Sequence, residues 1–175
     1  MSTLFANYGQ WIVFLHVLAA FVWVGGMIAI RIAVHPVIAR GGLTAEQMRR
    51  NDVMKWMLPA PQRLGISLQI TGRLFNLVIP FIVILFATGM LMAIATGGHH
   101  GTLKSLFVTK EIIWTIMTLN FAYMYYQRHK AWSDFRAEEY ATAKARVGLI
   151  PLVLLPINII LGLVALALGI ALRGL

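Results

Sequence analysis

Four long apolar segments constrain this chain more than any other feature of its sequence. They cover residues 10–34, 74–95, 106–126 and 149–172. A helix needs about 20 residues to cross the roughly 30 Å hydrocarbon core of a bilayer, and each segment is long enough. Backbone groups in lipid must be hydrogen-bonded within the protein, so such segments are expected to be helices. The sequence therefore predicts an all-α integral membrane protein, a four-helix bundle that residues 1–175 form as a single domain.

The composition agrees with a membrane location and excludes several other classes of protein. Hydrophobic residues make up 59% of the chain and charged residues 12%, whereas soluble domains carry about 25% charged residues. Cysteine is absent, which excludes a disulfide framework, a thiolate metal site and a thiol nucleophile. The sequence shows neither a catalytic nucleophile nor a carboxylate pair, so whether the protein is an enzyme stays open.

The formal net charge of +9 is distributed unevenly among the connections between the four segments. Basic residues gather around the first and third connections: Arg31, Arg40, Arg49, Arg50, Lys55, Arg63, Arg73, Arg128, Lys130, Arg136, Lys144 and Arg146. Only Lys104 and Lys110 lie near the second, at 97–105. By the positive-inside rule, the first and third connections face the cytoplasm, and both termini lie outside it. We attribute the basic excess to this orientation and not to nucleic-acid binding.

The first connection is predicted to contain a short basic helix at residues 44–58. Thr44 and Glu46-Gln47 form the capping-box pattern that opens a helix, and Pro59 follows its end. Such a helix could rest on the membrane surface beside anionic lipid, or it could be a solvated connector packed on the bundle. Both alternatives are open.

Two features inside the segments concern helix packing. Pro80 cannot donate a backbone hydrogen bond to the carbonyl of Asn76, so we expect a kink there that faces the other helices. In the fourth segment, Gly162 and Gly169 lie on one face with Asn158. Small residues of this kind allow helices to pack closely.

Polar side chains within the membrane are candidate site residues, because an ionisable group at mid-membrane costs about 2.5–3.5 kcal/mol on insertion scales. They are His16, Lys110, Glu111, Asn120 and Asn158. Lys110 begins the third segment. It either snorkels to the outer interface or points inward, where it would offer a cation to a haem propionate or another acidic ligand.

His16 is the strongest of these candidates, because it is the only histidine well inside a segment. It shares a helical face with Ala19, Ala20, Trp23 and Met27, and the small residues indicate that this face points into the bundle. An inward imidazole could ligate haem iron, bind copper or relay protons. Alternatively, it only forms a hydrogen bond to a neighbouring helix.

A candidate metal site follows from the predicted topology. His16, Met90 and Met92 lie in the outer half of the bundle, and His99 and His100 lie in the outer connection. Thioethers favour Cu(I), imidazole suits several transition metals, and no thiolate is present to compete for zinc. The alternative is that the methionines fill gaps in the core and the two histidines are solvated.

Residues 15–27, with the sequence LHVLAAFVWVGGM, resemble the first helix of the CopD copper-resistance membrane family and of the related HemJ family of protoporphyrinogen oxidases. The spacing from His16 to Trp23 is shared by both families, and the resemblance continues weakly through Pro80, Thr88-Gly89 and Lys110. It implies that His16, Trp23 and Lys110 are site residues, with His16 as a haem or copper ligand.

The resemblance is divided between the two families. The Trp-Val-Gly-Gly sequence at 23–26 and Asn120 are closer to CopD, whereas the compact four-helix size and the pair Arg31 and His35 are closer to HemJ. We therefore expect a multi-pass protein of a bacterial inner membrane with copper or haem b as its cofactor. Copper handling is the first hypothesis, a haem b redox protein the second, and a non-catalytic accessory subunit of a membrane complex the third. The sequence leaves open whether the chain forms a homo-oligomer.

Overall fold

The computed structural model describes residues 2–39, 58–97 and 104–174. The predicted helix at 44–58 lies outside these ranges except for its last residue, and His99 and His100 also lie outside them. The structural statements below concern the described residues.

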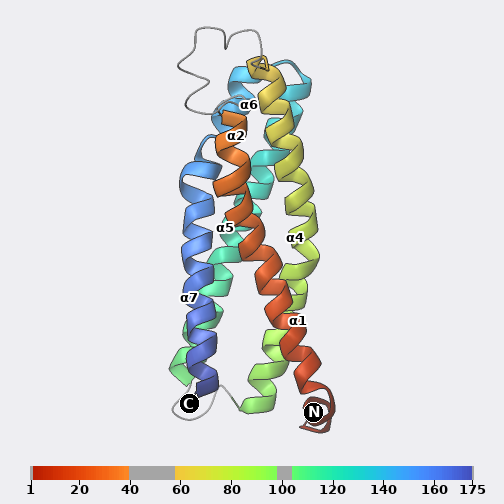
Figure 1. Cartoon of the computed structure of the whole chain (residues 1–175), viewed down its shortest axis with the longest axis vertical. Helices are drawn as coiled ribbons and strands as arrows, with labels where there is room; N and C mark the ends of the chain where they lie inside the picture. The colour runs from red at the N-terminus through yellow and green to blue at the C-terminus, as the bar shows by residue number, and fades with distance from the viewer. Residues whose placement is uncertain (1, 40–57, 98–103, 175) are drawn as a thin grey trace.

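The described residues form four long helices and several short helical segments (Figure 1). The elements in chain order are α1 Ser2–Ala29, the π-helical turn η1 Ile30–Val34, α2 His35–Ala39, α4 Ala60–Thr96, α5 Lys104–Arg136, α6 Tyr140–Val147, the π-helical turn η3 Ile150–Leu154, and α7 Leu155–Gly174. Figure 1 shows that α1 starts and α7 ends at one end of the bundle, where α4 also ends and α5 begins. We call this the terminal end. The opposite end, with α2, α6 and the start of α4, is called the basic end.

Three helical segments are long and apolar enough to cross a membrane: Asn7–Val34, Ala60–Thr96 and Tyr140–Leu172. The predicted third span, 106–126, is not among them, although α5 runs beside α4 and α7 through the bundle (Figure 1). Lys110, Glu111 and Asn120 lower its hydropathy. The chain is an all-α integral membrane protein with a four-helix bundle, as the sequence predicted.

The main hydrophobic core lies where the four long helices meet. The side chains of Trp23, Met27, Phe75 and Met124 are almost fully buried there. The ring of Phe121 meets Trp23 edge-on, with ring centroids 6.1 Å apart, and meets Phe75 at 5.1 Å. Edge-to-face pairs of this kind add stability beyond the area that they bury.

Two helices extend farther toward the basic end than the apolar segments predicted. α4 begins at residue 60 instead of 74, and α5 continues to residue 136 instead of 126. The added turns pack on one another and on α6 through a second apolar cluster, whose buried members are Leu68, Ala131 and Ala143. An ion pair between Asp134 and Arg146 also joins α5 to α6. Tertiary contacts therefore stabilise helical turns that hydropathy alone does not indicate.

Pro80 does not face the other helices, and this expectation from the sequence is wrong. α4 continues through Pro80 without interruption, and the side chains of both Pro80 and Asn76 are exposed. The buried residues nearby are Val78 and Ile82. Successive residues of a helix are rotated by about 100°. Pro80 is two positions from both Val78 and Ile82 and therefore points away from the core.

Candidate functional site between the helices

His16 lies on the buried face of α1 and points toward α4. It lies nine residues after Asn7, the first residue of the span Asn7–Val34, and therefore about 14 Å from that end of the span. Its Nδ1 atom lies 2.9 Å from Oγ1 of Thr88 on α4. The predicted inward orientation of His16 is therefore confirmed.

The hydrogen bonds of Thr88 define the protonation of the His16 ring. The Thr88 hydroxyl has a single proton, and its oxygen lies 2.6 Å from the backbone carbonyl of Ile84, to which it donates. Oγ1 therefore accepts a hydrogen bond from His16, whose proton is on Nδ1. In the neutral ring this tautomer leaves Nε2 without a proton, and the ring also interacts with the backbone carbonyl of Leu85. A metal-ligating histidine usually donates its other ring N–H in this way.

Gly89 allows the His16 ring to lie directly against α4. A Cβ atom at Gly89 would be 3.4 Å from Cε1 of His16, which is the edge of van der Waals contact. Larger side chains at this position would push the imidazole away. Thr88 and Gly89 thus orient the same ring, one by a hydrogen bond and the other by its small size.

Lys110 also points into the bundle, from α5 toward α7. Its Nζ atom would lie 3.0 Å from a Cβ atom at Gly169, so the ammonium group occupies the space beside that glycine. Its charge acts electrostatically on His16. Among the described residues, Lys110 forms no hydrogen bond and no ion pair. The structure therefore favours the inward alternative for Lys110 over snorkelling to the interface.

Trp114 adds a second donor without an acceptor, one turn from Lys110 on α5. Its Nε1 atom is buried and has no hydrogen-bond partner in the described part of the chain. Its ring packs against Phe86 of α4 with centroids 4.9 Å apart. Trp114 was not among the site residues predicted from the sequence, although its spacing of four residues from Lys110 places the two on one helical face.

Trp23 lies in the core two turns from His16 on the same face of α1. Its side chain is 1% exposed, and its Nε1 atom has no hydrogen-bond partner among the described residues. Its contact with Phe121 gives it a packing role. No contact in the described structure joins it to His16 or Lys110.

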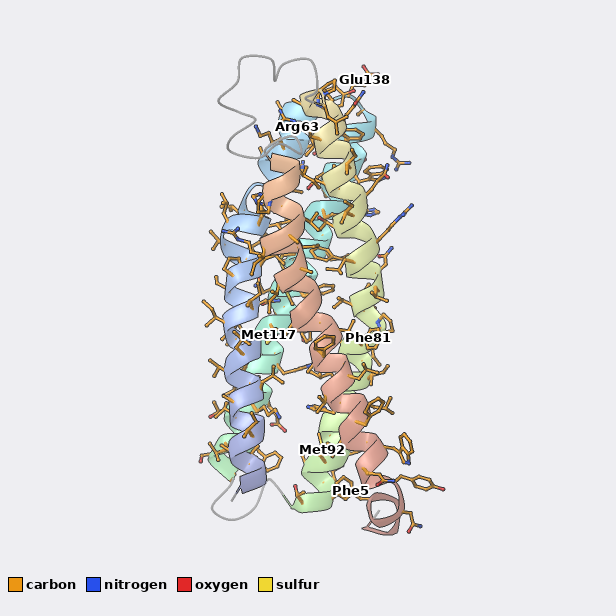
Figure 2. All side chains as sticks on the ribbon, in the orientation of Figure 1. Phe5, Arg63, Phe81, Met92, Met117 and Glu138 are labelled. Atoms are coloured by element: carbon orange, nitrogen blue, oxygen red, sulfur yellow. The ribbon has the colours of Figure 1, made fainter. Side chains whose placement is uncertain are left out.

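The candidate copper site is only partly assembled in the described residues. Met92 is half-buried on α4, one turn after Thr88, and Figure 2 shows it toward the terminal end. The side chain of Met90 is 54% exposed and faces outward. No group of three or more His, Cys, Asp or Glu residues that could hold a metal occurs in the described ranges.

Asn120 and Asn158 form a polar clamp between α5 and α7. The Asn120 amide donates to the Asn158 side chain at 2.8 Å and to the carbonyl of Leu154 at 3.0 Å. The amide of the fully buried Asn158 donates to the carbonyl of Met117 at 3.1 Å. Both amide groups donate to protein acceptors, so we assign this pair to helix association and not to ligand binding.

Comparison of the chain with protein-family models, curated proteins and solved structures finds no match. The fold and site define a class of protein on their own: a helical membrane bundle with a neutral imidazole, an ammonium group and an indole N–H directed between its helices. Nζ of Lys110 and Nε1 of Trp114 have no hydrogen-bond partner among the described residues, and Nδ1 of His16 is bound to Thr88. This set is the candidate functional site.

Proposed function

We propose that this protein is a haem b-binding membrane redox protein and that His16 is the iron ligand. The observation that carries the proposal is the hydrogen bond from Nδ1 of His16 to Thr88, because a metal-ligating histidine usually donates its other ring N–H in this way and would bind iron through Nε2. Gly89 supports the same ring orientation. The resemblance of residues 15–27 to the HemJ family supports the same ligand.

Lys110 and Trp114 would provide a cation and a hydrogen-bond donor for the propionates, which are the acidic side chains of haem. An ammonium group inside a membrane bundle is costly unless it has a partner, and the described residues supply none to Lys110. A haem propionate would be such a partner, and the buried Trp114 N–H is a second donor for a carboxylate. Bound haem would supply a one-electron redox centre. The protein's own contributions are the ligand, the positive charge, and the helix packing that excludes water.

An absorption spectrum of the purified full-length protein tests this proposal. We expect a Soret band in the wild-type protein and its loss in His16→Ala. His129→Ala is the matched control, because His129 is an exposed histidine on α5. Its spectrum should be unchanged. A wild-type protein without a Soret band after expression with sufficient haem would contradict the proposal, and so would full retention of haem by His16→Ala.

Copper handling of the CopD type is the second candidate, and Met92 is the observation that favours it. Met92 follows Thr88 by one turn on α4, so a thioether and the imidazole of His16 approach the same face. The positive charge of Lys110 opposes a metal cation at His16, which is why we place copper second. Metal analysis showing stoichiometric copper, lost in both His16→Ala and Met92→Leu and without a Soret band, would establish this candidate instead.

We also propose that the basic end faces the cytoplasm and that both termini lie outside it. Several basic side chains belong to the basic end: Arg63, Arg73, Arg128, Lys130, Arg136, Lys144 and Arg146. Lys104, Lys110 and Arg173 are the described basic residues near the terminal end, fewer than at the basic end, and the positive-inside rule gives the orientation. Reporter fusions after residue 97 should be active only on the outer side. Activity of these fusions in the cytoplasm would reverse the proposed topology.

A further inference from the structure

A membrane-exposed groove with one cation lies between α1–α2 and α7. It has a volume of about 520 Å³. One wall is formed by Ile28, Arg31, Ile32 and Pro36, and the other by Pro156, Ile159 and Ile160. Ile32 and Ile160 are 71% and 61% exposed, so the groove opens on the outer surface of the bundle. It is separate from the His16 site, which lies inside the bundle.

Two π-helical turns shape this groove. In η1 the N–H of His35 donates to the carbonyl of Ile30, and Pro36 follows directly. In η3 the N–H of Leu155 donates to the carbonyl of Ile150, and Pro156 follows directly. Each wall therefore carries a proline without an N–H next to a widened turn. Such π-turns occur frequently at functional sites.

Within the described ranges, Arg31 is the only charged residue that lines the groove. Among the described residues it forms no hydrogen bond and no ion pair. Burial, and secondly the charge of Arg31, lower the pKa of the neighbouring His35, and a histidine carries no negative charge in either protonation state. Arg31 lies three residues before the end of the span Asn7–Val34, about 4.5 Å along the helix. Its guanidinium can reach the depth of lipid headgroups.

We propose that this groove binds an anionic phospholipid, with the headgroup phosphate on Arg31 and an acyl chain along the isoleucine walls. Arginine binds phosphate through two parallel hydrogen bonds, and this would give Arg31 a partner that the described residues do not supply. The apolar walls suit an acyl chain. The depth of Arg31 matches a lipid in the bilayer better than a soluble phosphate compound, and the single charge requires a lipid of net negative charge.

The proposal is tested with the full-length protein in nanodiscs that are made of phosphatidylcholine with about 10% phosphatidylglycerol. The measured quantity is the phosphatidylglycerol retained per protein after extraction into mild detergent, determined by native mass spectrometry. We expect Arg31→Gln to reduce retention about fivefold, which corresponds to about 1 kcal/mol. Arg73→Gln is the matched control, because it removes an exposed arginine from α4. It should retain the lipid.

Two further measurements define the outcome. Ile160→Trp should also reduce retention by filling the groove without changing any charge, and the wild-type protein should prefer phosphatidylglycerol over phosphatidylcholine. Soluble glycerophosphate should not displace the bound lipid. An equal reduction in Arg31→Gln and Arg73→Gln would show a general surface-charge effect and overturn the proposal. Displacement by glycerophosphate would overturn the role of the acyl chain. Circular dichroism of each variant verifies that the helices are intact.

Discussion

The two cationic side chains that α5 directs into the bundle, Arg128 and Lys110, differ in their partners. Toward the basic end, Nε of Arg128 donates to the carbonyl of Leu68 at 2.9 Å, and its guanidinium lies 5.5 Å from the ring of Trp132. Toward the terminal end, Lys110 and Trp114 have no acceptor in the described residues. Groups that the protein itself satisfies stabilise the fold. Buried atoms without a partner also occur elsewhere among the described residues, at Nε1 of Trp23 and Oε1 of Gln127, so it is the combination of Lys110, Trp114 and His16 that distinguishes the terminal half.

In both halves of the bundle, a glycine lies directly beside an inward cationic side chain. Arg128 of α5 lies against Gly72 of α4 toward the basic end. Lys110 of α5 lies against Gly169 of α7 near the terminal end. A Cβ atom at Gly72 would overlap the guanidinium itself, whereas a Cβ atom at Gly169 would meet only the tip of Lys110. The small residues predicted to serve helix packing therefore also accommodate charges.

Gly72→Ala is expected to have the largest effect on stability. The added methyl group would displace the guanidinium of Arg128 and break its hydrogen bond to Leu68, because the two groups overlap. Overpacking of this kind costs about 1–3 kcal/mol. Thermal unfolding in detergent micelles measures the loss.

Gly169→Ala is the matched control for this comparison. The flexible end of Lys110 can move by a few tenths of an ångström, so stability should change by about 0.5 kcal/mol or less. Haem retention should fall instead, because the ammonium group is displaced from its position. Equal destabilisation by the two alanine substitutions would contradict the difference between the halves.

Asn158→Leu is expected to have an intermediate effect on stability. The substitution keeps a similar volume but removes the acceptor for Asn120 and the donor for the carbonyl of Met117. Interhelical hydrogen bonds in membranes contribute about 0.6 kcal/mol on average and up to about 1.7 kcal/mol. Thermal unfolding should report a loss in this range, with unchanged haem content. Loss of haem would place the asparagine pair in the site.

Glu138→Gly should have the smallest effect, and it should be stabilising. Glu138 has a φ angle of 64° in the turn between α5 and α6, a conformation that disfavours residues with a Cβ atom. Glycine removes that strain but loses more conformational entropy on folding, so we expect a gain of about 0.5 kcal/mol or less. A measurable decrease in melting temperature would show that the Glu138 side chain itself contributes to the turn.

The fold was largely predictable from the sequence because hydropathy and length determine membrane helices. The inward direction of His16 was also predictable, since small residues share its face. The pattern at residues 62–73 also indicated that the second helix could extend toward the cytoplasm, whereas the extension of α5 was not predicted, because contacts among Leu68, Ala131 and Ala143 stabilise it. The hydrogen bond of His16 to Thr88 and the position of Lys110 beside Gly169 could not be predicted either. They depend on which residues of separate helices lie at the same depth, which periodicity within one helix does not determine.

Ligand-dependent thermal unfolding tests most directly whether the terminal half binds a cofactor while the polar clamp only stabilises the bundle. His16→Ala and Asn158→Leu should each lower the melting temperature of the haem-free protein, by about 1 kcal/mol of unfolding free energy. Haem b added at one hundred times its dissociation constant should stabilise the wild type and Asn158→Leu by about 2.7 kcal/mol. It should leave His16→Ala unchanged. Equal stabilisation of His16→Ala and Asn158→Leu by haem would contradict the assignment of His16 as the ligand.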